Sequence, residues 1–83
     1  MMELVGERLR LLREKAHLSQ AKLAELLSTR QSAVNRYEHG QSAVPFSLLR
    51  SYADYFDVSL DYIFGRTDQP QGKIYEYKPN LSN

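Results

Sequence analysis

The sequence contains no cysteine and no long apolar run. Without cysteine the chain forms neither disulfides nor thiolate metal sites, so a cytoplasmic location is expected. No stretch approaches the roughly 18 apolar residues that a membrane-spanning helix needs, and a membrane partner is not expected. The first residues, MMELVGERLRLL, reach a charge at Glu3 and lack the apolar stretch and cleavage site of a secretion signal.

Catalytic and metal-binding patterns are also missing. His17 and His39 are the only histidines, and a metal site would need further carboxylates that the pattern does not supply. Asp54, Asp57 and Asp61 are close in sequence, but Asp61 falls in the first turn of an expected helix, where the helix dipole favours an acid. No Ser/His/Asp arrangement and no glycine-rich phosphate loop is present. We therefore expect no enzyme, no metal site and no cofactor.

What is present indicates one small globular domain. The 83 residues are 42% hydrophobic and 25% charged, which is ordinary for such a domain. The net charge is only +1, but residues 1–44 hold seven Lys/Arg against five Asp/Glu, whereas residues 45–83 hold four against five. The small basic excess in the first half is a weak indication of a nucleic-acid partner.

Apolar residues recur at helical spacing from about residue 4 to residue 65 and predict an all-α domain of five helices. The first helix is expected over about residues 4–17. The second should begin after Ser19, whose hydroxyl can accept from the free amides of the first turn. The residues expected to line the core are Val5, Leu9, Leu12, Leu18, Leu23, Ala24, Leu27, Val34, Tyr37, Leu48, Leu49, Tyr52, Ala53, Phe56, Val58, Leu60, Ile63 and Phe64.

The third helix, over about residues 30–39, has two candidate caps. Ser28 and Gln31 fit a capping box, whereas Thr29 could cap the helix instead. Gly40 should end this helix, because glycine adopts the left-handed conformation without strain. Ser59 is expected to cap a short fifth helix.

Residues 66–83 differ in character from the rest. The stretch RTDQPQG contains turn formers without an apolar anchor and indicates a linker. Residues 73–78 alternate loosely and are rich in β-forming side chains, but a lone strand is not stable by itself. This segment is expected to pair with a second chain as a dimerisation arm, to lie on the helical body, or to stay disordered. We divide the chain into a domain of residues 1–65 and a tail of residues 66–83, where a protein partner could bind.

The third helix has two chemically different sides. Val34 and Tyr37 face one way, and the polar residues on the other side can read bases, since Gln and Asn pair bidentately with adenine and Arg with guanine. A solvated helix face is the alternative, because most amphipathic helices turn polar residues outward. Two details favour base reading: no acid occurs between residues 28 and 37, and Glu/Lys pairing is absent. The exposed candidates are Gln31, Ser32, Asn35 and Arg36.

Residues 4–65 resemble the phage-repressor (Cro/repressor-like, or XRE) helix-turn-helix family. The matching pieces are RLRLLREKAHLSQAKLAELL, AVNRYEHG and SYADYFDVSLDYIFG, which fall within about three quarters of the chain. Leu-Ser-Gln at 18–20, Leu-Ala at 23–24 and Tyr-Glu-x-Gly at 37–40 have the spacing of the family. The resemblance implies a compact five-helix, lambda-repressor-like domain.

The resemblance also implies roles for individual residues. It implies base contacts from Gln31, Ser32, Asn35 and Arg36. It implies phosphate contacts from Gln20, Arg30, Gln41 and Ser42, and a structural ion pair between Arg13 and Glu38. The sequence departs from the family at Ser28, where glycine is common, at Arg30, where a capping Ser or Thr is common, and at Lys22 and Ala33.

Two functions of different classes remain open. The first is a sequence-specific transcriptional regulator, most simply a repressor, that binds near-palindromic double-stranded DNA as a homodimer. The second is a protein-interaction module, such as an antitoxin or adaptor, that uses the fifth helix and the tail. Deleting residues 66–83 separates them: retained DNA binding with loss of a co-purifying protein would indicate a partner site in the tail.

Overall fold

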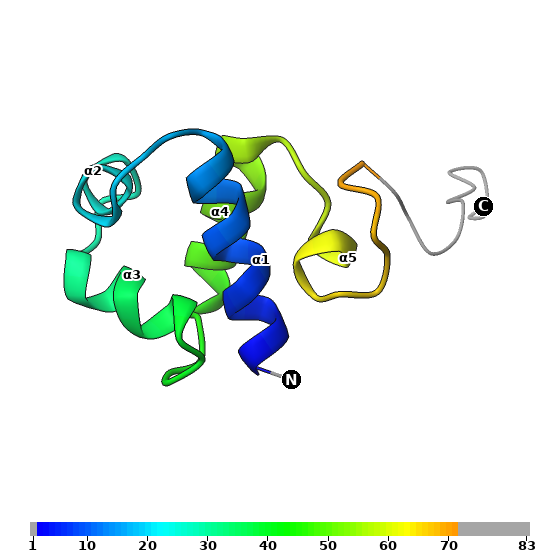
Figure 1. Ribbon diagram of the computed structural model, residues 1–83, viewed down its shortest axis with the longest axis horizontal. Helices are drawn as coiled ribbons and strands as arrows, with labels where there is room; N and C mark the ends of the chain where they lie inside the picture. The colour runs from blue at the N-terminus through cyan, green and yellow to red at the C-terminus, as the bar shows by residue number, and fades with distance from the viewer. Residues whose placement is uncertain (1, 72–83) are drawn as a thin grey trace, which may run out of the picture.

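Helix α1 (Met2–Lys15) crosses the middle of the molecule, with the other helices placed around it (Figure 1). Helices α2 (Gln20–Leu26) and α3 (Gln31–Glu38) lie on one side of α1, and α5 (Leu60–Ile63) lies on the other. Helix α4 (Phe46–Phe56) completes the core. The computed structural model describes residues 2–71, and within them the chain is all-α with five helices, as predicted.

Two of the predicted helix caps are present. The Ser19 hydroxyl accepts a hydrogen bond of 3.0 Å from the Lys22 amide, and the Ser59 hydroxyl accepts one of 3.0 Å from the Tyr62 amide. Helix α1 ends at Lys15, two residues earlier than predicted, because His17 adopts a left-handed backbone with φ +59°.

The predicted cap of α3 is wrong. Neither Ser28 nor Thr29 caps this helix, because both residues close the end of α2. Ser28 has a left-handed backbone (φ +57°), and the Thr29 amide donates to the Ala24 carbonyl at 2.9 Å. Helix α3 therefore begins at Gln31 with Arg30 as its N-cap, and the Arg30 side chain makes no hydrogen bond to the first-turn amides.

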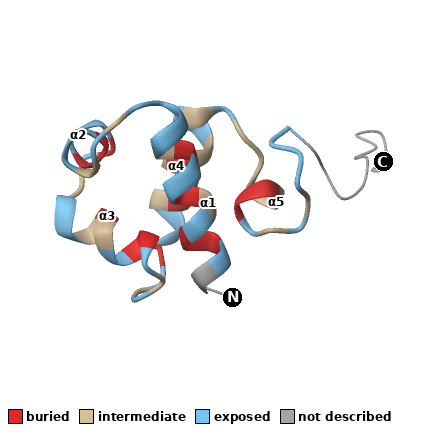
Figure 2. Cartoon of the chain, viewed as in Figure 1, coloured by how far each residue is buried: buried red, intermediate tan, exposed pale blue. Residues whose placement is uncertain are grey.

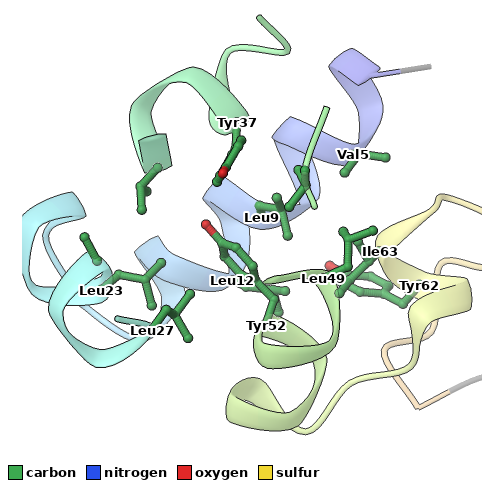
Figure 3. Close-up of a cluster of buried hydrophobic side chains, with 13 residues drawn as sticks. Val5, Leu9, Leu12, Leu23, Leu27, Tyr37, Leu49, Tyr52, Tyr62 and Ile63 are labelled. Carbon is green, nitrogen blue, oxygen red and sulfur yellow. The ribbon is translucent and has the colours of Figure 1, made fainter. Parts of the chain in front are cut away.

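The buried side chains form one cluster at the junction of the helices (Figures 2 and 3). Its centre contains Tyr52, whose ring stacks at 6.3 Å from that of Phe56. The prediction that Phe64 belongs to the core is wrong: it is 41% exposed, since the inner side of the four-residue α5 is already taken by Tyr62 and Ile63. The buried apolar residues are Val5, Leu9, Leu12, Leu23, Ala24, Leu27, Val34, Tyr37, Val44, Leu49, Tyr52, Tyr62 and Ile63.

The chain after α5 turns back onto the helices. The Arg8 guanidinium lies 4.4 Å from the centre of the Tyr62 ring, donates to the Thr67 carbonyl at 3.1 Å, and pairs with Asp68 at 2.8 Å. These polar contacts hold the described part of the predicted linker, which lacks an apolar anchor. The segment 73–78 and its proposed arm lie outside the described residues, so the boundary at residue 65 stays a prediction.

Within the described part of the chain, none of the helices is both long enough and apolar enough to cross a bilayer.

Candidate nucleic-acid interface

Helix α3 presents a polar surface that is supported from behind by the core. Val34 is fully buried and Tyr37 is buried beside it, so the helix is fixed in orientation. Gln31, Ser32 and Arg36 are exposed on the opposite side. Asn35, the remaining predicted base contact, is half-buried where α3 meets α2.

A chain of side-chain hydrogen bonds joins the start of α2 to this polar surface. The Gln31 amide nitrogen donates to the Gln20 amide oxygen at 2.7 Å. The Gln20 amide nitrogen in turn donates to Glu38 at 3.0 Å and to Asn35 at 3.3 Å. Gln20, a predicted phosphate contact, therefore also holds two of the predicted base contacts in place. These bonds leave the outer edge of the Gln31 amide available to a base.

Arg13 and Glu38 form a bidentate ion pair between α1 and α3. Arg13 Nε lies 2.6 Å from Glu38 Oε2, and Arg13 Nη2 lies 2.9 Å from Oε1. Arg13 Nη1 also donates to the Leu18 carbonyl at 2.9 Å, and Glu38 is buried. The hydrogen bond to Glu38 raises the pKa of Arg13 against the opposing effect of burial, so the guanidinium stays charged. Removing either partner would leave a buried charge without compensation, which makes the pair important for the angle between the helices.

The loop after α3 is closed against the last turn of the helix. Gly40 adopts a left-handed conformation with φ +71°. Its amide donates to the Tyr37 carbonyl at 3.1 Å, and the Gln41 amide donates to the Arg36 carbonyl at 2.9 Å. This pattern is a Schellman motif. It brings Ser42 next to the Arg36 side chain, and Arg36 Nε donates to Ser42 Oγ at 3.2 Å.

The electrostatics of this surface favour an anion. Arg30 and Arg36 are exposed at the two ends of α3. The one acid within α3 is Glu38, which is buried and neutralised by Arg13. A phosphate backbone that approaches α3 therefore meets cations without exposed carboxylates of the same helix.

Sequence reasoning missed several contacts at this site, among them the hydrogen bonds of Gln20 described above and two more. The first is Gly6 of α1, where an added Cβ would lie 2.6 Å from the carbonyl oxygens of Tyr37 and Glu38. The second is the hydrogen bond between Arg36 and Ser42. The sequence assigns Arg36 to a base and Ser42 to a phosphate, without a contact between them. The spacing across the turn at Gly40 could have indicated this second contact, since a Schellman motif brings the following loop back to the helix.

A short helix, a tight turn and a second helix with an exposed polar side define a helix-turn-helix, whose second helix enters the DNA major groove. The family model described as "Helix-turn-helix" (HTH_3) matches residues 9–63. The chain therefore belongs to this helix-turn-helix family, of the XRE or Cro-like type, and the matched region is a DNA-binding domain of transcriptional regulators and not an enzyme.

Two relatives agree with this assignment. An uncharacterized HTH-type transcriptional regulator of Bacillus subtilis, YobD, is 38% identical over 68 residues, covering 82% of this chain and 61% of the relative. A putative HTH-type transcriptional regulatory protein of Pyrococcus furiosus is 42% identical over 55 residues, covering 66% of this chain and 18% of the relative. The chain thus spans about three fifths of the first relative's length and less than one fifth of the second's.

Two solved structures have a similar fold. The restriction-modification controller protein C.AhdI from Aeromonas hydrophila superposes with a TM-score of 0.69 at 33% identity, covering 76% of this chain and 96% of that protein. An HTH_3 family transcriptional regulator from Vibrio cholerae superposes with a TM-score of 0.68 at 23% identity, covering 84% and 38% respectively. The second similarity supports the fold alone.

Proposed function

We propose that this protein is a sequence-specific transcriptional repressor that binds near-palindromic double-stranded DNA as a homodimer. The observation that carries the proposal is the polar side of α3, which is exposed while Val34 and Tyr37 fix the helix from behind. Repression is the simplest consequence, since a dimer seated on a promoter excludes other proteins from the same DNA.

In this proposal α3 reads bases and its surroundings bind the backbone. Gln31 and Asn35 suit adenine, Arg36 suits guanine, and Ser32 can donate or accept. These side chains project from one helix, which is the arrangement that major-groove reading requires.

The phosphate contacts are assigned to both ends of α3. Arg30 precedes the helix, where its charge and the first-turn amides that its side chain leaves uncapped favour an anion. Gln41 and Ser42 follow the helix in the loop closed by Gly40. Gln20 contributes its main-chain amide from the start of α2, where helix-turn-helix proteins meet the backbone. Both hydrogens of its side-chain amide are already donated to Asn35 and Glu38.

A homodimer would place two copies of α3 in successive major grooves about 34 Å apart. We assign the contact between protomers to two exposed apolar side chains, Leu4 of α1 and Phe64 at the end of α5, which we name the Leu4–Phe64 patch. These side chains are 38% and 41% exposed, and Leu4 lies against Gly65. The patch belongs to α1 and the end of α5, and α5 lies on the opposite side of α1 from α3 (Figure 1), so pairing there would leave the polar surface free.

Selection of bound sequences from random duplexes, at one stated salt concentration, tests the proposal. The expected product is an inverted pair of half-sites whose centres are about 10–10.5 base pairs apart. A bound pool without any enriched sequence would contradict sequence-specific binding. Enrichment of single half-sites would contradict only the homodimer.

A further inference from the structure

Ser42, assigned above to a phosphate contact, also makes a hydrogen bond within the protein. Its hydroxyl oxygen accepts a hydrogen bond from Arg36 Nε at 3.2 Å. Arg36 is exposed, whereas Ser42 is half-buried in the loop after α3. A long side chain proposed to read a base is therefore hydrogen-bonded to a less exposed neighbour.

The position of Ser42 is determined by the backbone. The Gln41 amide bonds to the Arg36 carbonyl at 2.9 Å, and the Gly40 amide bonds to the Tyr37 carbonyl at 3.1 Å. Arg36 is thus connected to this loop twice, once through its carbonyl and once through its guanidinium. The loop cannot move away from the helix without breaking the Schellman motif.

The bond at Nε also determines which edge of the guanidinium is available. An arginine side chain carries five N–H donors in a planar fork. With the Nε–H of Arg36 bound to Ser42, the Nη1 and Nη2 groups remain to pair with the O6 and N7 acceptors of a guanine. Arginine loses much rotamer freedom when it binds, and ordering it beforehand reduces that loss.

We propose that Ser42 is a positioning residue for base recognition: it orients the Arg36 guanidinium so that its outer fork reads one base pair. The proposal rests on the function proposed above and adds a determinant of specificity to it. Ser42 can hold Arg36 and still contact a phosphate, because a hydroxyl has two acceptor lone pairs and one donor. The two roles predict different effects on binding.

The test measures affinity for the selected operator and for operators changed at the base pair read by Arg36, at fixed salt. Ser42→Ala is expected to reduce discrimination at this base pair about threefold to tenfold, as for the loss of one hydrogen bond. Ser42→Thr, which keeps the acceptor oxygen, is expected to preserve discrimination. In an Arg36→Ala background, Ser42→Ala should change discrimination no further. Ser51→Ala, which removes a hydroxyl on α4, is the matched control.

A second measurement needs no DNA. In the free protein, the NMR order parameter of the Arg36 Nε–H should fall in Ser42→Ala and stay high in Ser42→Thr. An unchanged order parameter in Ser42→Ala would overturn the proposal.

The binding outcomes separate the two proposals. Equal weakening of all operators by Ser42→Ala would leave only a phosphate contact and overturn the positioning role. If the wild-type protein discriminates between base pairs and Ser42→Ala discriminates equally well, the positioning role alone fails. If the wild-type protein prefers no base at any position, the proposed function fails and the positioning role fails with it.

Discussion

The buried polar side chains of this protein differ in how fully their hydrogen-bonding groups are satisfied. The Arg13–Glu38 pair is fully engaged, with two direct bonds and a third to the Leu18 carbonyl. The hydroxyl of Tyr52, by contrast, is buried without a hydrogen-bond partner among the described residues. A buried polar atom of this kind lowers stability relative to an apolar atom of the same shape.

Replacing Tyr52 with phenylalanine should therefore maintain the free energy of unfolding or raise it by up to about 1 kcal/mol. Burial, followed by the charges of Glu38 and Tyr37, raises the pKa of Tyr52 above its ordinary 10.0. Since the unfolded chain loses this proton at lower pH than the folded chain, ionisation of Tyr52 favours unfolding. The free energy of unfolding is therefore unaffected by this ionisation below pH 10.0 and decreases as the pH rises above it.

Urea unfolding at pH 8 and pH 11 tests both parts. The wild-type protein should lose more stability between the two pH values than Tyr52→Phe, with Tyr55→Phe at an exposed position as control. Equal losses in wild type and Tyr52→Phe would show that this hydroxyl does not cause the pH dependence.

Arg36 is the residue whose proposed base contact is easiest to measure. Arg36→Ala should weaken operator binding by about 1–3 kcal/mol and relax discrimination at one base pair. Titration of selected and altered operators at one salt concentration gives both quantities. Unchanged affinity, or equal weakening for every base, would refute the assignment of Arg36 to a base.

At the scale of helices, α3 is well capped at its C-terminus and poorly capped at its N-terminus. Its last turn is closed by the Schellman motif at Gly40, whereas its N-cap, Arg30, makes no side-chain bond to the first turn. Arginine is a poor cap, because it has no acceptor for the free amides. Its charge, however, suits a neighbouring phosphate, so stability and DNA binding favour different residues at this position.

Arg30→Ser should raise the free energy of unfolding by about 0.5–1 kcal/mol, because serine supplies the missing cap. The same change should weaken DNA binding. It should also reduce the slope of log affinity against log salt concentration by about 0.9 per protomer, as expected for the loss of one phosphate contact. Chemical denaturation and a salt titration measure the two effects. Arg50→Ser, which removes an exposed charge from α4, should leave the salt dependence unaltered. An undiminished slope in Arg30→Ser would remove Arg30 from the phosphate contacts.

Gly6 shows how contact between helices overrides local preference. Helix propensity alone predicts that Gly6→Ala stabilises α1 by about 1 kcal/mol. The added Cβ would instead lie 2.6 Å from two backbone carbonyl oxygens of α3, so we expect destabilisation by about 1–3 kcal/mol. Thermal unfolding measures the change, with Ala21→Gly at an exposed position of α2 to calibrate propensity. A stabilised Gly6→Ala protein would mean that α1 and α3 can move apart without loss of stability.

At the scale of the whole molecule, the proposed DNA-binding and pairing surfaces lie at different ends. Helix α3 occupies one side of α1 and α5 the other (Figure 1). Arg8 connects α1 with the segment after α5 through Thr67 and Asp68. The end that carries the Leu4–Phe64 patch is thereby tied to the same central helix that supports α3.

Phe64→Glu should separate the proposed homodimer into folded monomers, because it places a charge in the Leu4–Phe64 patch. Affinity for the full operator should fall, while weak binding to one half-site remains. Analytical ultracentrifugation with circular dichroism measures assembly and folding together, and Tyr55→Glu is the control for an exposed aromatic elsewhere. A dimeric Phe64→Glu protein would exclude this patch as the interface.

Much of this architecture follows from the sequence by itself. The number of helices, the caps at Ser19 and Ser59, and the buried positions of Val34 and Tyr37 follow from periodicity and from hydrogen bonds between near neighbours. The family resemblance also identified the type of domain. These features are local, since each depends on residues within one or two turns of the same helix.

Other features were decided by tertiary structure. Phe64 looked like a core residue, although the inner side of α5 was already filled by Tyr62 and Ile63. The close approach at Gly6 and the unpartnered hydroxyl of Tyr52 depend on residues more than ten positions away. The packing of the helices determines which side chains meet. These contacts join residues far apart in the sequence, so no local sequence pattern indicates them.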